Sequence, residues 1–129
     1  DKQLAYECVD LLCNKFWTRG LVSMHNARSG FNLDISGGMP ALVAEMLMQS
    51  KPGSIELLPV LPDQWPEGRV QGLRARGGIE VDIEWKEGQL VQATVKSLLG
   101  KPCQVRYGGV IRELDMKKGD SVRLGRDLQ

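Results

Sequence analysis

Residues 79–96 read IEVDIEWKEGQLVQATVK. One residue in two is apolar on either side of the central Lys86–Gln89 segment, first Ile79, Val81, Ile83 and Trp85 and then Val91, Ala93 and Val95. A period of two is typical of β-strands that have one face in a core and one face in water. The stretch therefore predicts an antiparallel hairpin with its turn at Lys86–Gln89 and the apolar side chains on the core face.

Shorter strand patterns lie on both sides of this hairpin. We expect them at Ile55–Leu58, Val70–Ala75, Gln104–Tyr107, Val110–Leu114 and Ser121–Leu124, with glycine-marked turns between several of them. The residues before Ser54 show helical periods instead. The predicted fold class is therefore α+β, with two N-terminal helices followed by an antiparallel, sandwich-like β-domain.

Helical periodicity is present at two places in the N-terminal part of the chain. Lys2–Trp17 predicts an amphipathic helix, and Cys8 on its apolar side is expected in the core. A second helix is expected from Pro40, in its first turn, to about Gln49. Between the two, Leu21–Gly37 has no sustained period and predicts a long irregular loop, a kind of segment that is often functional in a compact protein.

Composition argues against several classes of partner. The formal net charge is +1 with acids and bases interspersed, so we expect no nucleic-acid partner and no binding to an anionic membrane. The longest apolar run, Met39–Met48, contains Glu45 and is too short to cross a bilayer, so no membrane span is expected. Three cysteines without zinc-ligand spacing and a single histidine predict neither a metal site nor a cofactor.

The chain begins at Asp1 on a helical pattern, without an initiator Met, a basic start or an apolar leader. We therefore expect it to be a piece of a longer protein. The second helix is apolar around most of its circumference over Ala41–Met48. In the isolated chain, the two-helix segment is expected to pack onto its own β-domain, to swap with another copy, or to bury its apolar surface in a homo-oligomer.

Asp34 is the first candidate for chemistry. It lies in GFNLDISGG, residues 30–38, directly before the apolar helix. A short Gly-rich loop that leads into a buried helix can hold a carboxylate at the mouth of a cavity. The other interpretation is a turn or helix-capping acid, because Asp in such a loop often bonds nearby backbone amides.

The wider sequence around Asp34 resembles a known family. FNLDISGG precedes the helix ALVAEMLMQS, and Leu57–Trp85 then reads LLPVLPDQWPEGRVQGLRARGGIEVDIEW. This order of phrases is similar to the C-terminal part of glycoside hydrolase family 95, the alpha-L-fucosidases. The likeness covers Gly30–Lys96, about half of the chain, and is much more specific than a single short motif.

The resemblance implies an (α/α)6 catalytic barrel followed by a β-domain. Residues 1–51 are then expected to supply the last helices of the barrel, and residues 52–129 the β-domain. Asp34 matches the family's carboxylate that helps to activate water in an inverting mechanism, which needs a second carboxylic acid across the sugar. Because that acid matches no stretch here, the chain alone is expected to be inactive, and its parent to be a secreted or periplasmic enzyme with a glycan substrate.

The residues beside Asp34 extend this hypothesis. Phe31 and Asn32 are expected to bind substrate, as a ring under an apolar sugar face and an amide on a hydroxyl. They serve equally well as a core anchor and a turn residue. An alternative for the whole chain is a noncatalytic carbohydrate-binding or scaffolding β-domain with Trp65 and Trp85 as an aromatic surface. The strand phase favours Trp85 in the core, and Trp65 is expected to pack the domain connection.

Other polar residues are interpreted structurally. Glu45 and Gln49 lie one helical turn apart and predict a buried hydrogen bond. Arg74 is a candidate to clamp an acid across the interface between the helical and β parts. The acids that alternate along Glu80–Glu84 are interpreted as a solvated sheet face rather than a catalytic pair.

Overall fold

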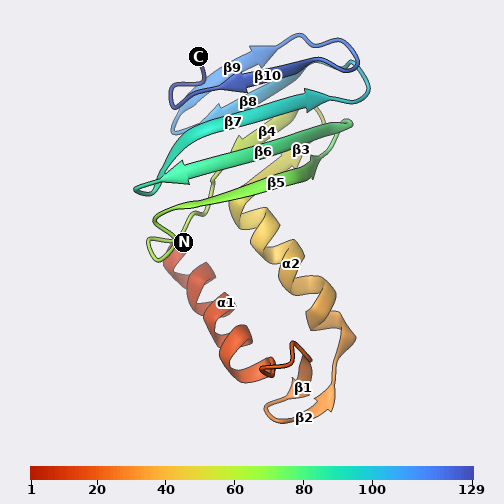
Figure 1. Ribbon diagram of the computed structural model, residues 1–129, viewed down its shortest axis with the longest axis vertical. Helices are drawn as coiled ribbons and strands as arrows, with labels where there is room; N and C mark the ends of the chain where they lie inside the picture. The colour runs from red at the N-terminus through yellow and green to blue at the C-terminus, as the bar shows by residue number, and fades with distance from the viewer.

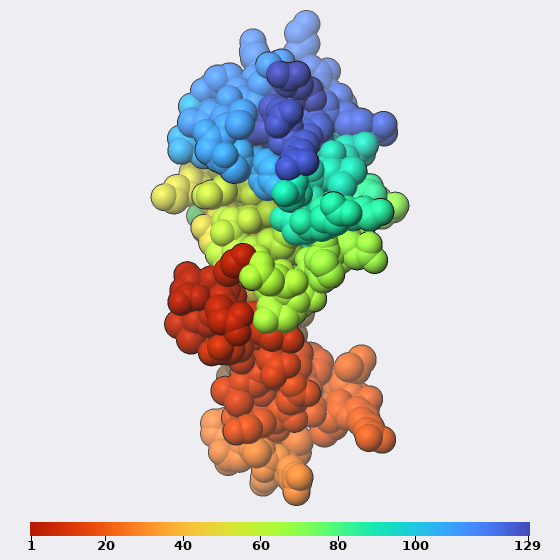
Figure 2. Space-filling model, turned by 90° about the vertical axis from the view of Figure 1, so that its left-hand side faces the viewer, coloured from red at the N-terminus to blue at the C-terminus, as the bar shows by residue number.

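The computed structural model describes residues 1–129. It confirms the α+β class, because two helices come first and a β-sandwich follows (Figure 1). The helices are α1 (Lys2–Phe16) and α2 (Leu33–Leu47), and a small hairpin of β1 (Met24–Asn26) and β2 (Ser29–Phe31) joins them. The helical part extends from one end of the sandwich and carries this hairpin at its far tip. Figure 2 shows the same elongated shape from the side.

The sandwich consists of two four-stranded sheets with a shared core, one ordered β10-β7-β6-β5 and the other β3-β4-β8-β9. Its strands are β3 (Met48–Lys51), β4 (Ser54–Leu57), β5 (Gly68–Ala75), β6 (Ile79–Lys86), β7 (Gln89–Ser97), β8 (Cys103–Tyr107), β9 (Val110–Leu114) and β10 (Ser121–Leu124). The expectation of a purely antiparallel domain is corrected at one pair, since β4 and β8 run parallel. Between these two strands the chain crosses to the other sheet to form β5, β6 and β7.

The strands expected around the central hairpin are all present, with small differences at their ends. β3 was not expected, because its first residues were predicted to be the end of the second helix. α2 instead ends at Leu47, and Met48 has an extended backbone with φ −153° and ψ 124°. Met48 pairs with Leu57 of β4 and is buried. Sheet pairing and burial therefore outweigh the helical tendency of these residues.

The predicted hairpin is present as β6 and β7. Its turn residues Glu87 and Gly88 both have positive φ, 54° and 69°, which suits the right-handed twist of a two-residue hairpin. Trp85 is buried as predicted, and its indole Nε1 donates to the carbonyl of Trp65 at 2.9 Å. Trp65 is partly buried and packs against the core cluster of the sandwich. Gly68 lies so close to the Trp85 ring that a Cβ there would be 2.3 Å from Cζ2.

One residue of the hairpin that was expected to face the core faces solvent instead, because of a β-bulge. Glu84 pairs with Gln92 but Trp85 pairs with Leu90, so Val91 is the extra residue of its strand. A bulge changes the side on which the following residues project. Leu90 therefore enters the core at 1% exposure, and Val91, predicted to face inward, is 47% exposed.

The first helix is capped by Asp1, and its packing face differs from the expected one. The Asp1 side chain accepts the backbone N–H groups of Gln3 and Leu4 at 3.0 and 3.1 Å. Val9 is the buried residue of α1, whereas Cys8 is exposed. The expectation that Cys8 packs in the core is therefore wrong, because adjacent helical residues project about 100° apart.

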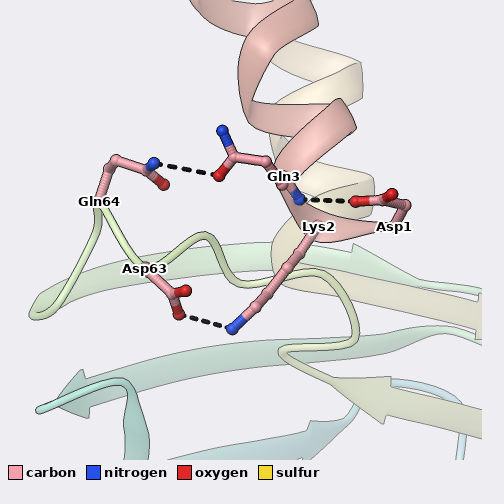
Figure 3. Close-up of polar contacts among 5 residues, drawn as sticks. All are labelled: Asp1, Lys2, Gln3, Asp63 and Gln64. Atoms are coloured by element: carbon pink, nitrogen blue, oxygen red, sulfur yellow. Dashed lines mark hydrogen bonds and ion pairs between the residues drawn. The ribbon is translucent and has the colours of Figure 1, made fainter.

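The helical part contacts its own sandwich, which is one of the expected arrangements. Leu47 at the end of α2 enters the core cluster of the sandwich. At the start of α1, Lys2 Nζ lies 2.5 Å from Asp63 Oδ1, and Gln64 Nε2 donates to Gln3 Oε1 at 3.3 Å (Figure 3). No helix of the chain is both long enough and apolar enough to cross a membrane.

Candidate functional site

Asp34 lies in the first turn of α2. The segment expected to be an irregular loop is ordered as the β1–β2 hairpin, in which Met24 pairs with Phe31 and Asn26 with Ser29. The helix then begins at Leu33, well before Pro40, so the proline lies inside α2 instead of in its first turn. Backbone pairing in the short hairpin and a strong cap outweigh the weak local pattern. The structure thus places Asp34 in the first turn of α2, directly after the β1–β2 hairpin that forms the far tip of the molecule (Figure 1).

Asn32 is the cap that starts this helix. Its side-chain Oδ1 accepts the backbone N–H groups of Asp34 and Ile35 at 2.8 and 3.3 Å. Its own backbone N–H donates to the Ser23 carbonyl at 3.0 Å, and its carbonyl accepts the Ser23 hydroxyl. Asn32 therefore takes the capping role that was one interpretation of Asp34.

The Asp34 carboxylate is left without a partner in the chain. Its side chain makes no hydrogen bond, and the two ion pairs of the structure, Lys2–Asp63 and Arg74–Glu80, lie in other parts of the molecule. Asp34 is exposed, and the neighbouring Phe31 is 67% exposed. The site therefore presents the Asp34 carboxyl group and an aromatic ring to solvent.

His25 lies beside this cap, although the sequence favours an ordinary loop histidine over an acid or base near a sugar. Because Asn32 Oδ1 accepts two backbone N–H groups, its amide orientation is fixed and Nδ2 is the end that faces His25 Nδ1, at 3.3 Å. A donor at Nδ2 requires a lone pair on Nδ1, so neutral His25 carries its proton on Nε2. Pairing of β1 with β2 brings the two residues together, and no spacing in the sequence signals this contact.

Other groups of the chain do not form a second reactive centre. Cys103 is buried, and burial raises the pKa of its thiol, with a smaller contribution from the negative charge of Glu113. A protonated buried thiol is a poor nucleophile. No group of three or more His, Cys, Asp or Glu residues converges as metal ligands.

Two structural interpretations of polar residues are corrected. Glu45 and Gln49 are both exposed instead of making a buried hydrogen bond to a neighbouring element, because α2 ends between them and Gln49 belongs to β3. Arg74 does not reach across to the helical part. It pairs with Glu80, directly opposite on the next strand, at 2.8 Å.

Asp34 lines none of the following hollows of the molecule. An apolar groove of about 300 Å³ separates α2 from β5 and is lined by residues that include Trp17, Met39, Val43 and Leu73. A polar hollow of about 500 Å³ lies where α2 meets β3, β4 and β8, and another of about 200 Å³ lies on the β10-β7-β6-β5 sheet.

Comparison with known proteins places the chain in a family of glycoside hydrolases. Residues 49–126, which span β3 to β10, match the family model described as glycoside hydrolase family 95, C-terminal domain. The chain therefore belongs to this family, and the resemblance noted in its sequence is confirmed. It is also 39% identical over 126 residues to Alpha-L-fucosidase 2 of Arabidopsis thaliana. That alignment covers 96% of this chain but only 15% of the relative.

Proposed function

We propose that this chain is the C-terminal part of an inverting glycoside hydrolase that acts on alpha-L-fucosides or related glycans, and that Asp34 helps to activate the attacking water. The observation that carries the proposal is the Asp34 carboxylate itself, which is exposed and unpaired on a helix turn capped by Asn32. The name of the relative, an alpha-L-fucosidase, supports the substrate class.

The position of Asp34 suits a group that binds water. A carboxylate without internal partners keeps its lone pairs for a water molecule. The cap and the hairpin hold the backbone of this turn at several points, which limits the motion of the carboxylate. Such preorganisation supports general base catalysis, which requires a base within hydrogen-bond reach of the attacking water.

Phe31 and Asn32 are proposed to contact the sugar. The exposed Phe31 ring offers a face for the apolar side of a sugar. Asn32 Oδ1 is occupied by the helix cap, but its Nδ2 carries two N–H groups, and only one is needed for His25. The second N–H is available to donate to a sugar hydroxyl.

The chain supplies only half of the machinery that inversion requires. The second carboxylic acid has to lie roughly 6.5–9.5 Å away across the sugar. We propose that it comes from a preceding catalytic barrel to which residues 1–51 contribute the last helices, while residues 52–129 form the β-domain. The isolated chain is accordingly expected to be inactive.

The test uses the full-length protein that contains this chain, assayed with aryl alpha-L-fucosides and alpha-L-galactosides. Asp34→Asn is expected to lower kcat by about 10²–10⁴-fold, the usual contribution of a general base, with KM little changed. Asp115→Asn, an exposed acid of the sandwich without a hydrogen bond, is the matched control and should retain full activity. Proton NMR of the first product formed should show the inverted anomer.

Two results would contradict the proposal. Unchanged turnover in Asp34→Asn would remove this residue from the mechanism. A folded wild-type parent that hydrolyses no glycoside of a broad panel would favour a noncatalytic role for the family's architecture in this protein.

A further inference from the structure

The outer face of the β10-β7-β6-β5 sheet contains a polar hollow of about 200 Å³. All but one of its lining residues are polar, and they include Arg69, Gln71, Asp82, Glu84, Thr94 and Arg123. The hollow belongs to the sandwich and is lined by no residue of the helical part, whereas Asp34 lies in the first turn of α2. The two sites are therefore separate.

Strand register arranges these side chains in two rows across the sheet. Arg69 of β5 lies opposite Glu84 of β6. In the second row, Asp82 lies opposite Thr94 of β7, which lies opposite Arg123 of β10. Directly opposed side chains on one sheet face have Cβ atoms about 4.5–5.5 Å apart. Each row thus brings an acid and an arginine to the same small surface.

The charges of the hollow are not used in ion pairs. Arg74 and Glu80, which are opposed on the same two strands, form an ion pair at 2.8 Å. Arg69 and Glu84 are also opposed but form none. Hydrogen-bonding capacity therefore stays open inside the hollow, while the comparable pair outside it is internally satisfied.

Two polar groups of the hollow are held in place by the bulge in β5. The register of β5 shifts between Val70 and Leu73, and the backbone N–H of Gly72 in this bulge donates to Asp82 Oδ1 at 2.8 Å. Arg69 Nη2 donates to Gln71 Oε1 at 2.7 Å. Bulges commonly redirect side chains next to functional sites. Here the bulge fixes an acceptor and leaves the second oxygen of Asp82 free.

We propose that this hollow is an accessory binding site for a neutral oligosaccharide. The carboxylates of Asp82 and Glu84 accept, and the guanidinium groups of Arg69 and Arg123 donate, as the many hydroxyl groups of a sugar require. The two positive and two negative side chains balance, so a neutral polyol fits, while an anionic sugar gains no net attraction because the two arginines and the two carboxylates offset each other. The choice of a glycan rests on the proposed function, because it places the chain in a glycan-degrading enzyme.

The test is a titration of the 129-residue chain by ¹⁵N-¹H NMR with 2′-fucosyllactose, lactose and 3′-sialyllactose. The neutral sugars are expected to shift amides of the hollow saturably, and sialyllactose to bind no more tightly than they do. The double variant Glu84→Gln/Arg123→Gln should weaken binding of the neutral sugars at least tenfold. Lys96→Gln is the matched control, since Lys96 is exposed on the strand of Thr94 but outside the hollow, and it should bind like the wild type.

The proposal is overturned if neutral sugars at millimolar concentration give no saturable shifts, if the shifts map elsewhere, or if Lys96→Gln weakens binding as much as the double variant. Tighter binding of sialyllactose than of the neutral sugars would also overturn it. The chain with Asp34→Asn should bind normally. An inactive parent with intact binding would therefore contradict only the catalytic proposal, and an active parent without binding only this one.

Discussion

The sandwich and the helical part differ in how completely they bury their apolar residues. The sandwich encloses a cluster of 19 buried residues, of which α2 contributes only Leu47. The helices leave much of their apolar surface open, since Leu4 is 58%, Leu11 45% and Leu33 70% exposed. Val9 is the single buried residue of α1. One region therefore carries its own core, whereas the other leaves many of its apolar side chains exposed.

Two further features of the helical part support this view. The apolar groove between α2 and β5 is lined by Trp17, Met39 and Val43 among others. The indole N–H of Trp17 is buried without a hydrogen-bond partner, which costs about 1–3 kcal/mol. We propose that further residues of a longer protein cover the groove and accept a hydrogen bond from the Trp17 indole, because the chain corresponds to only 15% of its relative.

The largest effect is expected from a substitution in the core of the sandwich. Ile83 is 1% exposed, and Ile83→Ala should lower the free energy of unfolding by about 2–5 kcal/mol through lost burial and a cavity. Leu4→Ala on α1 is the matched control and should change it by less than about 0.5 kcal/mol. Urea unfolding followed by circular dichroism measures both. Similar losses in the two variants would show that α1 packs as firmly as the sandwich.

A pair of glycine substitutions is expected to act in opposite directions in the two regions. Gly68→Ala places a methyl group against the Trp85 ring and should destabilise the sandwich by about 1–3 kcal/mol. Gly37 lies inside α2 with nothing within 4 Å of its virtual Cβ. Gly37→Ala should therefore stabilise the helix by about 0.5–1 kcal/mol. Thermal unfolding distinguishes them, and destabilisation by Gly37→Ala would mean that α2 is more tightly packed than its exposure indicates.

The same contrast explains which parts of the fold the sequence predicts. Alternation along Ile79–Lys86 and a Gly-containing turn specify the β6–β7 hairpin locally, and these features are confirmed. β3 was missed because Met48 owes its extended backbone to pairing with β4, a partner that periodicity cannot reveal. The exposure of Val91 was missed because a bulge leaves the apolar pattern of the strand unchanged.

The candidate site was predictable only in part. Asp34 stands out by its place before an apolar helix, and the family resemblance gives that place a role to propose. The cap on Asn32 and the contact with His25 depend on the β1–β2 hairpin, whose sequence has no sustained period. The second acid of the proposed mechanism matches no stretch of this sequence, so it was never open to prediction from these residues.

A smaller effect is expected at the helix cap. Asn32→Ala removes the acceptor of the Asp34 and Ile35 amides and should destabilise the first turn of α2 by about 1 kcal/mol. Hydrogen exchange of these two amides should become faster, while amides of the sandwich keep their protection. Asn26→Ala, an exposed hairpin residue, should leave the turn unchanged. Loss of protection throughout the sandwich would show that the two regions unfold as one unit.

The smallest effect concerns the ion pair that links α1 to the connection between β4 and β5. Lys2 and Asp63 are 53% and 79% exposed, so water and salt screen their attraction (Figure 3). A double-mutant cycle of Lys2→Ala and Asp63→Ala should give a coupling energy of about 0.2–1 kcal/mol that falls towards zero in 1 M salt. A larger, salt-resistant coupling would mean that the link is shielded from water. The helical part would then be fixed to the sandwich more firmly than its few contacts imply.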